Sequence, residues 1–163
     1  MKIRFVLNGE DVTVDTPPLS RFLDVVRDEF RLTATKEGCG EGECGSCSIL
    51  VDGKVVNSCL LPAVQVAGCE VETLESVATP GGALSILQET MLTADGAQCG
   101  ICTPGMIMAG TAYLRRLQAE SGTCDAQGAR IAIAGNLCRC TGYGKIIDAI
   151  MMASTEQCEG LRS

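Results

Sequence analysis

The chain has 163 residues, with 20 acidic against 13 basic side chains, a formal net charge of −7, eleven cysteines and no histidine. The negative charge disfavours binding to nucleic acid or to an anionic membrane surface, so we expect neither as a partner. The lack of histidine excludes a Rieske cluster and a Cys/His zinc finger. The partners are therefore expected to be other proteins.

Eleven cysteines are also compatible with a secreted, disulfide-linked scaffold. The count is odd, however, and the apolar stretch near residue 1 is too short for a signal-peptide core, with no twin-arginine pair before it. No apolar run reaches the ~18 residues that a membrane helix needs. We expect a cytoplasmic protein whose thiols stay reduced and available to iron.

The first predicted domain, residues 1–78, is rich in β-strands and contains one helix. The dipeptide Asn8-Gly9 is a strong signal for a two-residue hairpin turn between two strands. Ser20 is the expected N-cap of a helix that runs to about Phe30, with apolar residues at helical spacing. That helix should cover the hairpin.

A first group of four cysteines follows in and after a glycine-dense loop with the spacing C-x4-C-x2-C-x11-C. Its members are Cys39, Cys44, Cys47 and Cys59. Four thiolates complete the tetrahedral coordination of two irons in a [2Fe–2S] cluster, and the first two spacings, x4 and x2, match the plant-type ferredoxin run. Glycines allow close backbone approach, so peptide N–H groups can point at the sulfur atoms.

Cys69 is the rival of Cys59 for the fourth position. A second two-residue hairpin turn is expected at 52–53, and counting back from it places Cys47 opposite Ser58 and beside Cys59. Cys69 opens a separate alternating segment whose register brings no such proximity. We therefore predict Cys59 as a ligand and Cys69 as a core or strand residue.

A linker is predicted at 79–82, where the sequence reads Thr-Pro-Gly-Gly. Beyond it, in 83–163, the apolar spacing changes from period two to a helical period. Four helices are expected, beginning near Leu84, Met106, Ala126 and Lys145. Four short helices suggest a small bundle, so the predicted fold class is α+β with two domains.

A second group of four cysteines lies at the ends of these helices, with the spacing C-x2-C-x35-C-x-C. Its members are Cys99, Cys102, Cys138 and Cys140. Thr103 is expected to cap a helix that has Pro104 at its first position, so Cys102 would lie just outside a helix N-terminus, where the macrodipole favours thiolate. Gly135 and Thr141 are expected to stop the third helix and to start the fourth.

Three segments together closely resemble the small iron–sulfur subunit of the molybdenum hydroxylases, a group that includes xanthine dehydrogenases and aldehyde oxidoreductases. They are 39–47 (CGEGECGSC), 98–106 (QCGICTPGM) and 135–143 (GNLCRCTGY). The resemblance covers essentially the whole chain in the family's order. It implies an N-terminal β-grasp, plant-type ferredoxin-like [2Fe–2S] domain followed by a four-helix-bundle [2Fe–2S] domain.

The resemblance also implies a function, that of an electron-transfer subunit of a molybdenum-containing enzyme. Its partners would be a large molybdopterin-binding subunit and a medium FAD-binding subunit, commonly in a dimer of heterotrimers, with the pterin expected as a dinucleotide. Electrons would pass from the pterin site through two [2Fe–2S] clusters to FAD. Gln98 would hydrogen-bond the pterin and Cys140 would lie beside it.

This chain would carry no substrate site, and its sequence does not predict the substrate. We also expect the apolar stretch 100–112 to be partly an interface with the large subunit.

Two other functions are open to such a sequence. The first is a free-standing two-cluster ferredoxin-type carrier, although an ordinary plant-type ferredoxin lacks the helical domain. The second is a zinc-stabilised adaptor, although neither C-x-C nor a glycine-packed C-x4-C-x2-C is typical of zinc sites with four cysteines. Cys124 and Cys158 match neither motif, and we assign them no role.

Overall fold

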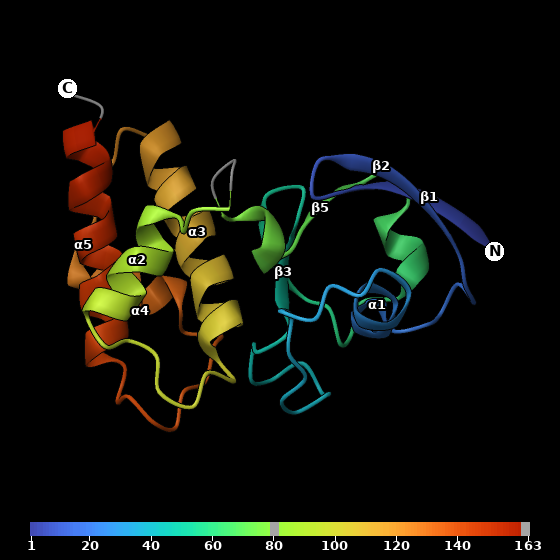
Figure 1. The fold of residues 1–163 in the computed structure, drawn as a ribbon, viewed down its shortest axis with the longest axis horizontal. Helices are drawn as coiled ribbons and strands as arrows, with labels where there is room; N and C mark the ends of the chain where they lie inside the picture. The colour runs from blue at the N-terminus through green and yellow to red at the C-terminus, as the bar shows by residue number, and fades with distance from the viewer. Residues whose placement is uncertain (79–81, 161–163) are drawn as a thin grey trace.

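The computed structural model describes residues 1–78 and 82–160. A sheet-rich half and a helical half lie side by side, as Figure 1 shows. The predicted α+β class is therefore confirmed. Most of the predicted linker at 79–82 lies outside the described residues, and the domain limits 1–78 and 83–163 stay predictions.

Five strands form one mixed sheet in the order β2-β1-β5-β3-β4. They are β1 (Lys2–Leu7), β2 (Glu10–Asp15), β3 (Ser48–Val51), β4 (Lys54–Asn57) and β5 (Glu70–Glu72). Only β1 and β5 are parallel neighbours; the other pairs are antiparallel. Both predicted hairpin turns are present, and positive φ angles at Asn8, Gly9, Asp52 and Gly53 give the geometry that a two-residue turn of this type requires.

A short helical segment covers one face of the sheet, as predicted. It consists of α1 (Phe22–Asp24) and a π-helical turn, η1 (Val25–Glu29), while two 3₁₀ turns, η2 (Ala63–Val66) and η3 (Leu74–Ser76), flank β5. Phe22 meets Phe5 of β1 edge to face, with 5.5 Å between ring centroids. Both rings belong to a buried core under the sheet.

Ser20 is not the N-cap of this helix, contrary to the prediction. Arg21 occupies that position, and no side chain caps the first turn. The N–H of Phe22 donates instead to the carbonyl oxygen of Leu61 at 2.8 Å. A carbonyl oxygen of a neighbouring loop therefore accepts the hydrogen bond that a capping hydroxyl would otherwise accept.

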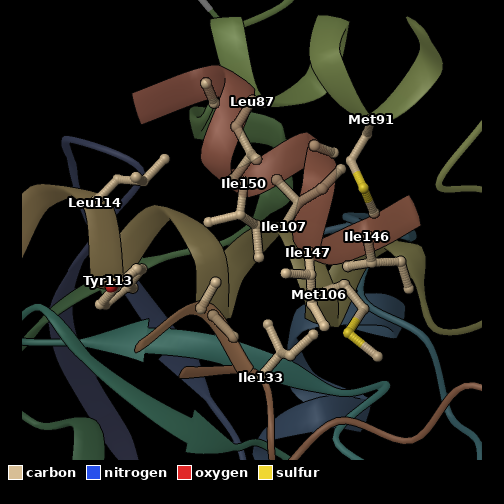
Figure 2. Packing of buried hydrophobic residues seen from close by; sticks show 14 of the residues in the cluster. Leu87, Met91, Met106, Ile107, Tyr113, Leu114, Ile133, Ile146, Ile147 and Ile150 are labelled. Carbon is tan, nitrogen blue, oxygen red and sulfur yellow. The ribbon is translucent and has the colours of Figure 1, made fainter. Parts of the chain in front are cut away.

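The helical half contains the four predicted helices. They are α2 (Ile86–Thr93), α3 (Thr103–Ala119), α4 (Ala126–Ala132) and α5 (Gly144–Gly160). Figure 2 shows their apolar core, in which Leu87 and Met91 of α2 and Ile146 and Ile150 of α5 are all buried. Among the described residues, no helix is both long enough and apolar enough to span a bilayer.

The start of α3 differs from the prediction by one residue. Cys102 is the N-cap, so Thr103 is the first helical residue and not the cap. The reason is that the backbone of Cys102 is already close to helical, and its carbonyl oxygen accepts the N–H of Met106 at 3.0 Å. Cys102 still lies at the N-terminus of the helix, as predicted.

The turn between α4 and α5 also differs in detail. The C-cap of α4 is Ile133, so the helix ends before Gly135. Thr141 does not start α5, which begins at Gly144. Its hydroxyl oxygen accepts the N–H of Tyr143 at 3.2 Å, which forms a local turn before the helix.

The two halves of the chain meet where α3 packs against β3 (Figure 1). β3 is buried on both faces. Ile49 belongs to the core under α1, and the next residue, Leu50, which points to the opposite face of the sheet, is only 1% exposed. Residues 104–111 of α3 are buried within this chain. The expected partner interface over 100–112 is therefore wrong for most of that stretch, and among its large apolar side chains only Ile101 is exposed, at 46%.

Candidate iron–sulfur sites

The cysteine-bearing loops of both halves lie along one edge of the molecule, the lower edge in Figure 1. Within each predicted group the thiols stand in pairs. The pairs are Cys39 with Cys44, Cys47 with Cys59, Cys99 with Cys140, and Cys102 with Cys138. Two pairs of thiolates suit a two-iron cluster, in which each iron takes two of the four protein ligands.

The glycine-dense loop directs peptide N–H groups at one sulfur. The N–H groups of Glu41, Glu43 and Cys44 donate to Cys39 Sγ over 3.3, 3.4 and 3.4 Å. Gly42, with a φ of 78°, lies between two of these donors and permits the curl of the loop. These hydrogen bonds lower the pKa of the exposed Cys39 thiol to about 7. The loop therefore stabilises the thiolate form of Cys39, which is the form that a cysteine must have to ligate a cluster.

The other pair of the first group is buried beneath that loop. Cys47 and Cys59 are 2% and 3% exposed. The predicted register is confirmed, since Ser58 donates both its N–H, at 3.3 Å, and its hydroxyl, at 2.8 Å, to the carbonyl oxygen of Cys47. Burial, together with the neighbouring Cys47 thiol, raises the pKa of Cys59 to about 11.

Cys69 lies apart from the first group. It immediately precedes β5, its thiol is 3.6 Å from the carbonyl oxygen of Gln65, and the carboxylate of Asp52 is also close to it. Cys69 is partly exposed and lies outside the apolar core, so the prediction that it is a core or strand residue is wrong in detail. The partners given for its thiol are Gln65 and Asp52 and not another cysteine, which agrees with the choice of Cys59.

The second group has a buried side and an exposed side. Cys102 is 5% exposed at the start of α3, and burial, together with Cys138, raises the pKa of its thiol to about 12. The expected preference for thiolate at this helix N-terminus is therefore outweighed by burial. Cys99 and Cys140 are exposed. Gln98, predicted to contact the pterin, is also exposed and adjoins Cys99 in the chain. The exposed side of this group is therefore accessible to a partner.

A buried hydroxyl beside the second group lacks a partner in the described part of the chain. It is Oγ1 of Thr103, which follows Cys102. Leaving such a group unpaired costs about 1–3 kcal/mol, so buried hydroxyls usually find a hydrogen bond. A bound cluster with its sulfur acceptors would supply one. Together with the thiol pairs and the N–H donors, this orphaned group fits a [2Fe–2S] cluster.

The turn that holds Cys138 contains two polar partners, Thr141 and Tyr143, that the sequence did not identify as contacts of the site. The hydroxyl of Tyr143 accepts the N–H of Cys138 at 3.0 Å, and Oγ1 of Thr141 lies 3.1 Å from Cys138 Sγ. Burial acts to raise the pKa of Cys138, but hydrogen bonds from Thr141, Cys140 and Cys102 together outweigh it and the pKa is lowered. The motif C-R-C-T-G-Y could have indicated these partners, since Thr141 and Tyr143 carry the side-chain hydroxyls nearest in sequence to Cys138 and Cys140.

Direct hydrogen bonds join the two cysteine-bearing loops. The N–H of Leu137 donates to the carbonyl oxygen of Cys44 at 2.8 Å. Nδ2 of the buried Asn136 donates to the carbonyl oxygen of Gly45 at 2.8 Å and to Oγ of Ser48 at 3.1 Å. Sequence reasoning missed Asn136, because its partners lie about 90 residues away in the other half.

This fold and these paired thiols are those expected of an iron–sulfur protein of the electron-transfer class. Residues 5–78 match the family described as "2Fe-2S iron-sulfur cluster binding domain", and residues 73–151 match the "[2Fe-2S] binding domain" family.

Relatives that match over most of their own length have subunit names. The chain is 44% identical to the nicotinate dehydrogenase small FeS subunit of Eubacterium barkeri, covering 96% of each chain. It is 40% identical to the xanthine dehydrogenase iron-sulfur-binding subunit of Escherichia coli O157:H7, covering 91% of each chain. A solved structure of quinoline 2-oxidoreductase from Pseudomonas putida 86 superposes with a TM-score of 0.89 at 39% identity, over 98% of this chain and 97% of that one.

The chain belongs to the family of small iron–sulfur subunits of the molybdenum hydroxylases. Its role is electron transfer within a multi-subunit oxidoreductase, and no substrate site of its own is needed for that role.

Proposed function

We propose that this subunit carries electrons between a large molybdopterin-binding subunit and a medium FAD-binding subunit. The proposed ligands of its two [2Fe–2S] clusters are Cys39, Cys44, Cys47 and Cys59 at the first site, and Cys99, Cys102, Cys138 and Cys140 at the second. The observation that carries the proposal is the arrangement of eight thiols as two sets of two pairs, on loops that hydrogen-bond to each other. Bound there, the clusters would supply one-electron chemistry.

The second site is the proposed entry point for electrons. Gln98, Cys99 and Cys140 are exposed together, whereas Cys102 is buried on the side toward α3. Exposure lets Gln98 hydrogen-bond a pterin on the large subunit, and it lets Cys140 lie beside that pterin. The exposed Cys39 at the first site is the corresponding proposed exit toward FAD.

The proposed assembly is a dimer of heterotrimers in the cytoplasm, with the pterin as a dinucleotide. Names such as caffeine dehydrogenase subunit gamma, from a Pseudomonas strain, support a complex of several different subunits. We also propose that 1–78 and 83–163 each hold one cluster, with 79–82 as the linker. No substrate is proposed, since the relatives' names include nicotinate, xanthine, caffeine and quinoline.

Iron analysis and electron paramagnetic resonance test this function. The full chain, reconstituted with iron and sulfide without oxygen, should contain about four irons and, when reduced, show two distinct [2Fe–2S] signals. A single signal, or zinc bound in stoichiometric amount, would contradict the proposal. Co-expression with its large and medium subunits should give one complex on gel filtration, whereas a free carrier would elute as a separate monomer.

A further inference from the structure

The side chain of Thr141 is placed between two neighbours in the second site. Its Oγ1 lies 3.1 Å from Cys138 Sγ and also accepts the N–H of Tyr143 at 3.2 Å. The hydroxyl of Tyr143 accepts the N–H of Cys138 at 3.0 Å, which closes the turn. Two hydrogen bonds of the threonine hydroxyl, and a third between Tyr143 and the backbone of Cys138, therefore fix that hydroxyl relative to one cysteine sulfur.

Which of Thr141 and Cys138 donates the hydrogen bond follows from which of them carries a proton. A cysteine that ligates iron is a thiolate and has no proton to give. A threonine hydroxyl has one donor and two acceptor sites, and the N–H of Tyr143 uses one of the acceptor sites. The O–H of Thr141 is therefore free to donate to the sulfur, in a charge-assisted bond that is about twice as strong as a neutral one.

The first site has a weaker counterpart of this contact. Oγ of Ser46 is 3.6 Å from Cys44 Sγ, 0.5 Å longer than the contact at Cys138. Four hydrogen bonds to the sulfurs of the Cys39–Cys44 pair come from peptide N–H groups, which no side-chain substitution removes. Thr141 is thus the closest side-chain hydroxyl donor to a proposed ligand sulfur that the structure gives.

We propose that Thr141 is a positioning residue that raises the reduction potential of the second cluster by donating a hydrogen bond to Cys138 Sγ. This inference rests on the proposed function, because it requires a cluster at that site. Reduction adds negative charge to the cluster and its sulfur ligands, so a donor to one of those sulfurs stabilises the reduced form more than the oxidised form. Without that donor the cluster accepts an electron less readily.

The test is a redox titration of the full, cluster-loaded chain, followed by electron paramagnetic resonance. In Thr141→Val, which keeps the branched shape, one signal should titrate at a more negative potential while the other is unchanged. Thr141→Ser, which restores the hydroxyl, should return the potential toward that of the wild type. The shifted signal should be the one that Cys102→Ala abolishes, and Ser46→Ala should leave its potential unchanged.

The outcomes separate this inference from the proposed function. If the wild type assembles no clusters, the proposed function fails. If Thr141→Val binds about four irons and both potentials equal those of the wild type, the inference is overturned while the function stands. Thr141→Ala is measured in parallel, and loss of the second signal in both variants would mean that Thr141 serves cluster assembly and does not set the potential.

Discussion

The N–H of Leu137 donates to the carbonyl oxygen of Cys44 at 2.8 Å, so one hydrogen bond joins the backbones of the two proposed cluster sites. Cys44 is a proposed ligand of the first site, and Leu137 directly precedes Cys138 of the second. Asn136 adds two more hydrogen bonds beside it. The two loops are therefore held as one unit, and the separation of the two sites depends on this contact.

Removing the Asn136 side chain should loosen that unit. The residue is 3% exposed and its amide donates to Gly45 and Ser48, so Asn136→Ala loses two neutral hydrogen bonds of about 0.5–1.5 kcal/mol each. We expect the free energy of unfolding to fall by about 1–3 kcal/mol, measured by urea denaturation of the loaded chain. Gln127→Ala, at an exposed position on α4, is the control and should change stability by less than about 0.5 kcal/mol. Equal midpoints for the two variants would show that the amide bonds contribute nothing net.

Two glycines on α3 should respond differently to alanine. A Cβ on Gly105 would overlap the carbonyl oxygen of Gly45 in the other half, and backbone atoms there cannot rotate away. Gly105→Ala should therefore destabilise the chain by about 1–3 kcal/mol, as overpacking does. A Cβ on Gly110 would instead meet, at 2.9 Å, the end of the Leu87 side chain, which can shift.

Gly110→Ala is the matched control, because alanine favours the helix over glycine by about 1 kcal/mol. We expect it to be close to neutral in the same urea experiment, with both cluster signals intact. If Gly105→Ala were as stable as Gly110→Ala, the close approach of α3 to the first loop would not limit the docking of the two halves.

The choice between two cysteines tests the first site. Cys59 pairs with Cys47 in the buried part of the site, whereas the thiol of Cys69 lies near Gln65 and Asp52. Cys59→Ala should lose or alter one of the two electron paramagnetic resonance signals and lower the iron content. Cys69→Ala should keep both signals and about four irons per chain. The reverse pattern would mean that the hairpin register does not select the ligand.

Local signals in the sequence predicted most of the fold, since each depends on neighbours in the chain. The two hairpin turns need only their own dipeptides, and the turn at 52–53 is enough to place Cys59 beside Cys47. Helix starts were less well predicted, because at Phe22 the carbonyl oxygen of the distant Leu61 replaces a cap. Such partners are set by tertiary packing, which a local pattern does not encode.

The candidate sites also divide into features that are local in sequence, which could be predicted, and contacts between distant residues, which could not. The cysteines could be grouped by spacing, but Asn136 could not be recognised, since a buried asparagine has no signature until its distant partners are known. The apolar stretch 100–112 is apolar around much of the helix because α3 lies between the sheet and the other helices. From sequence alone, an interface between two halves of one chain cannot be distinguished from an interface with a second chain.

Gln98→Ala tests where electrons enter. The proposed pterin contact is one neutral hydrogen bond, worth about 0.5–1.5 kcal/mol, and all eight proposed ligand thiols remain in the variant. Because Gln98 is exposed and precedes the exposed Cys99, its truncation should leave folding and both cluster signals unchanged. In the whole complex, reduction of the clusters by substrate should slow by about 2- to 13-fold, or the molybdenum cofactor occupancy should fall.

The measurement is stopped-flow reduction of the purified complex by its substrate, together with molybdenum and iron content. Gln127→Ala is again the control, since it removes an exposed glutamine from α4 and should change none of these quantities. Slower reduction with unchanged iron would place the defect between the partner's cofactor and the second site. If Gln98→Ala reduces at the wild-type rate with full molybdenum content and an unchanged potential of the second cluster, the entry contact is not at this residue, and the exposed Cys140 becomes the next candidate to test.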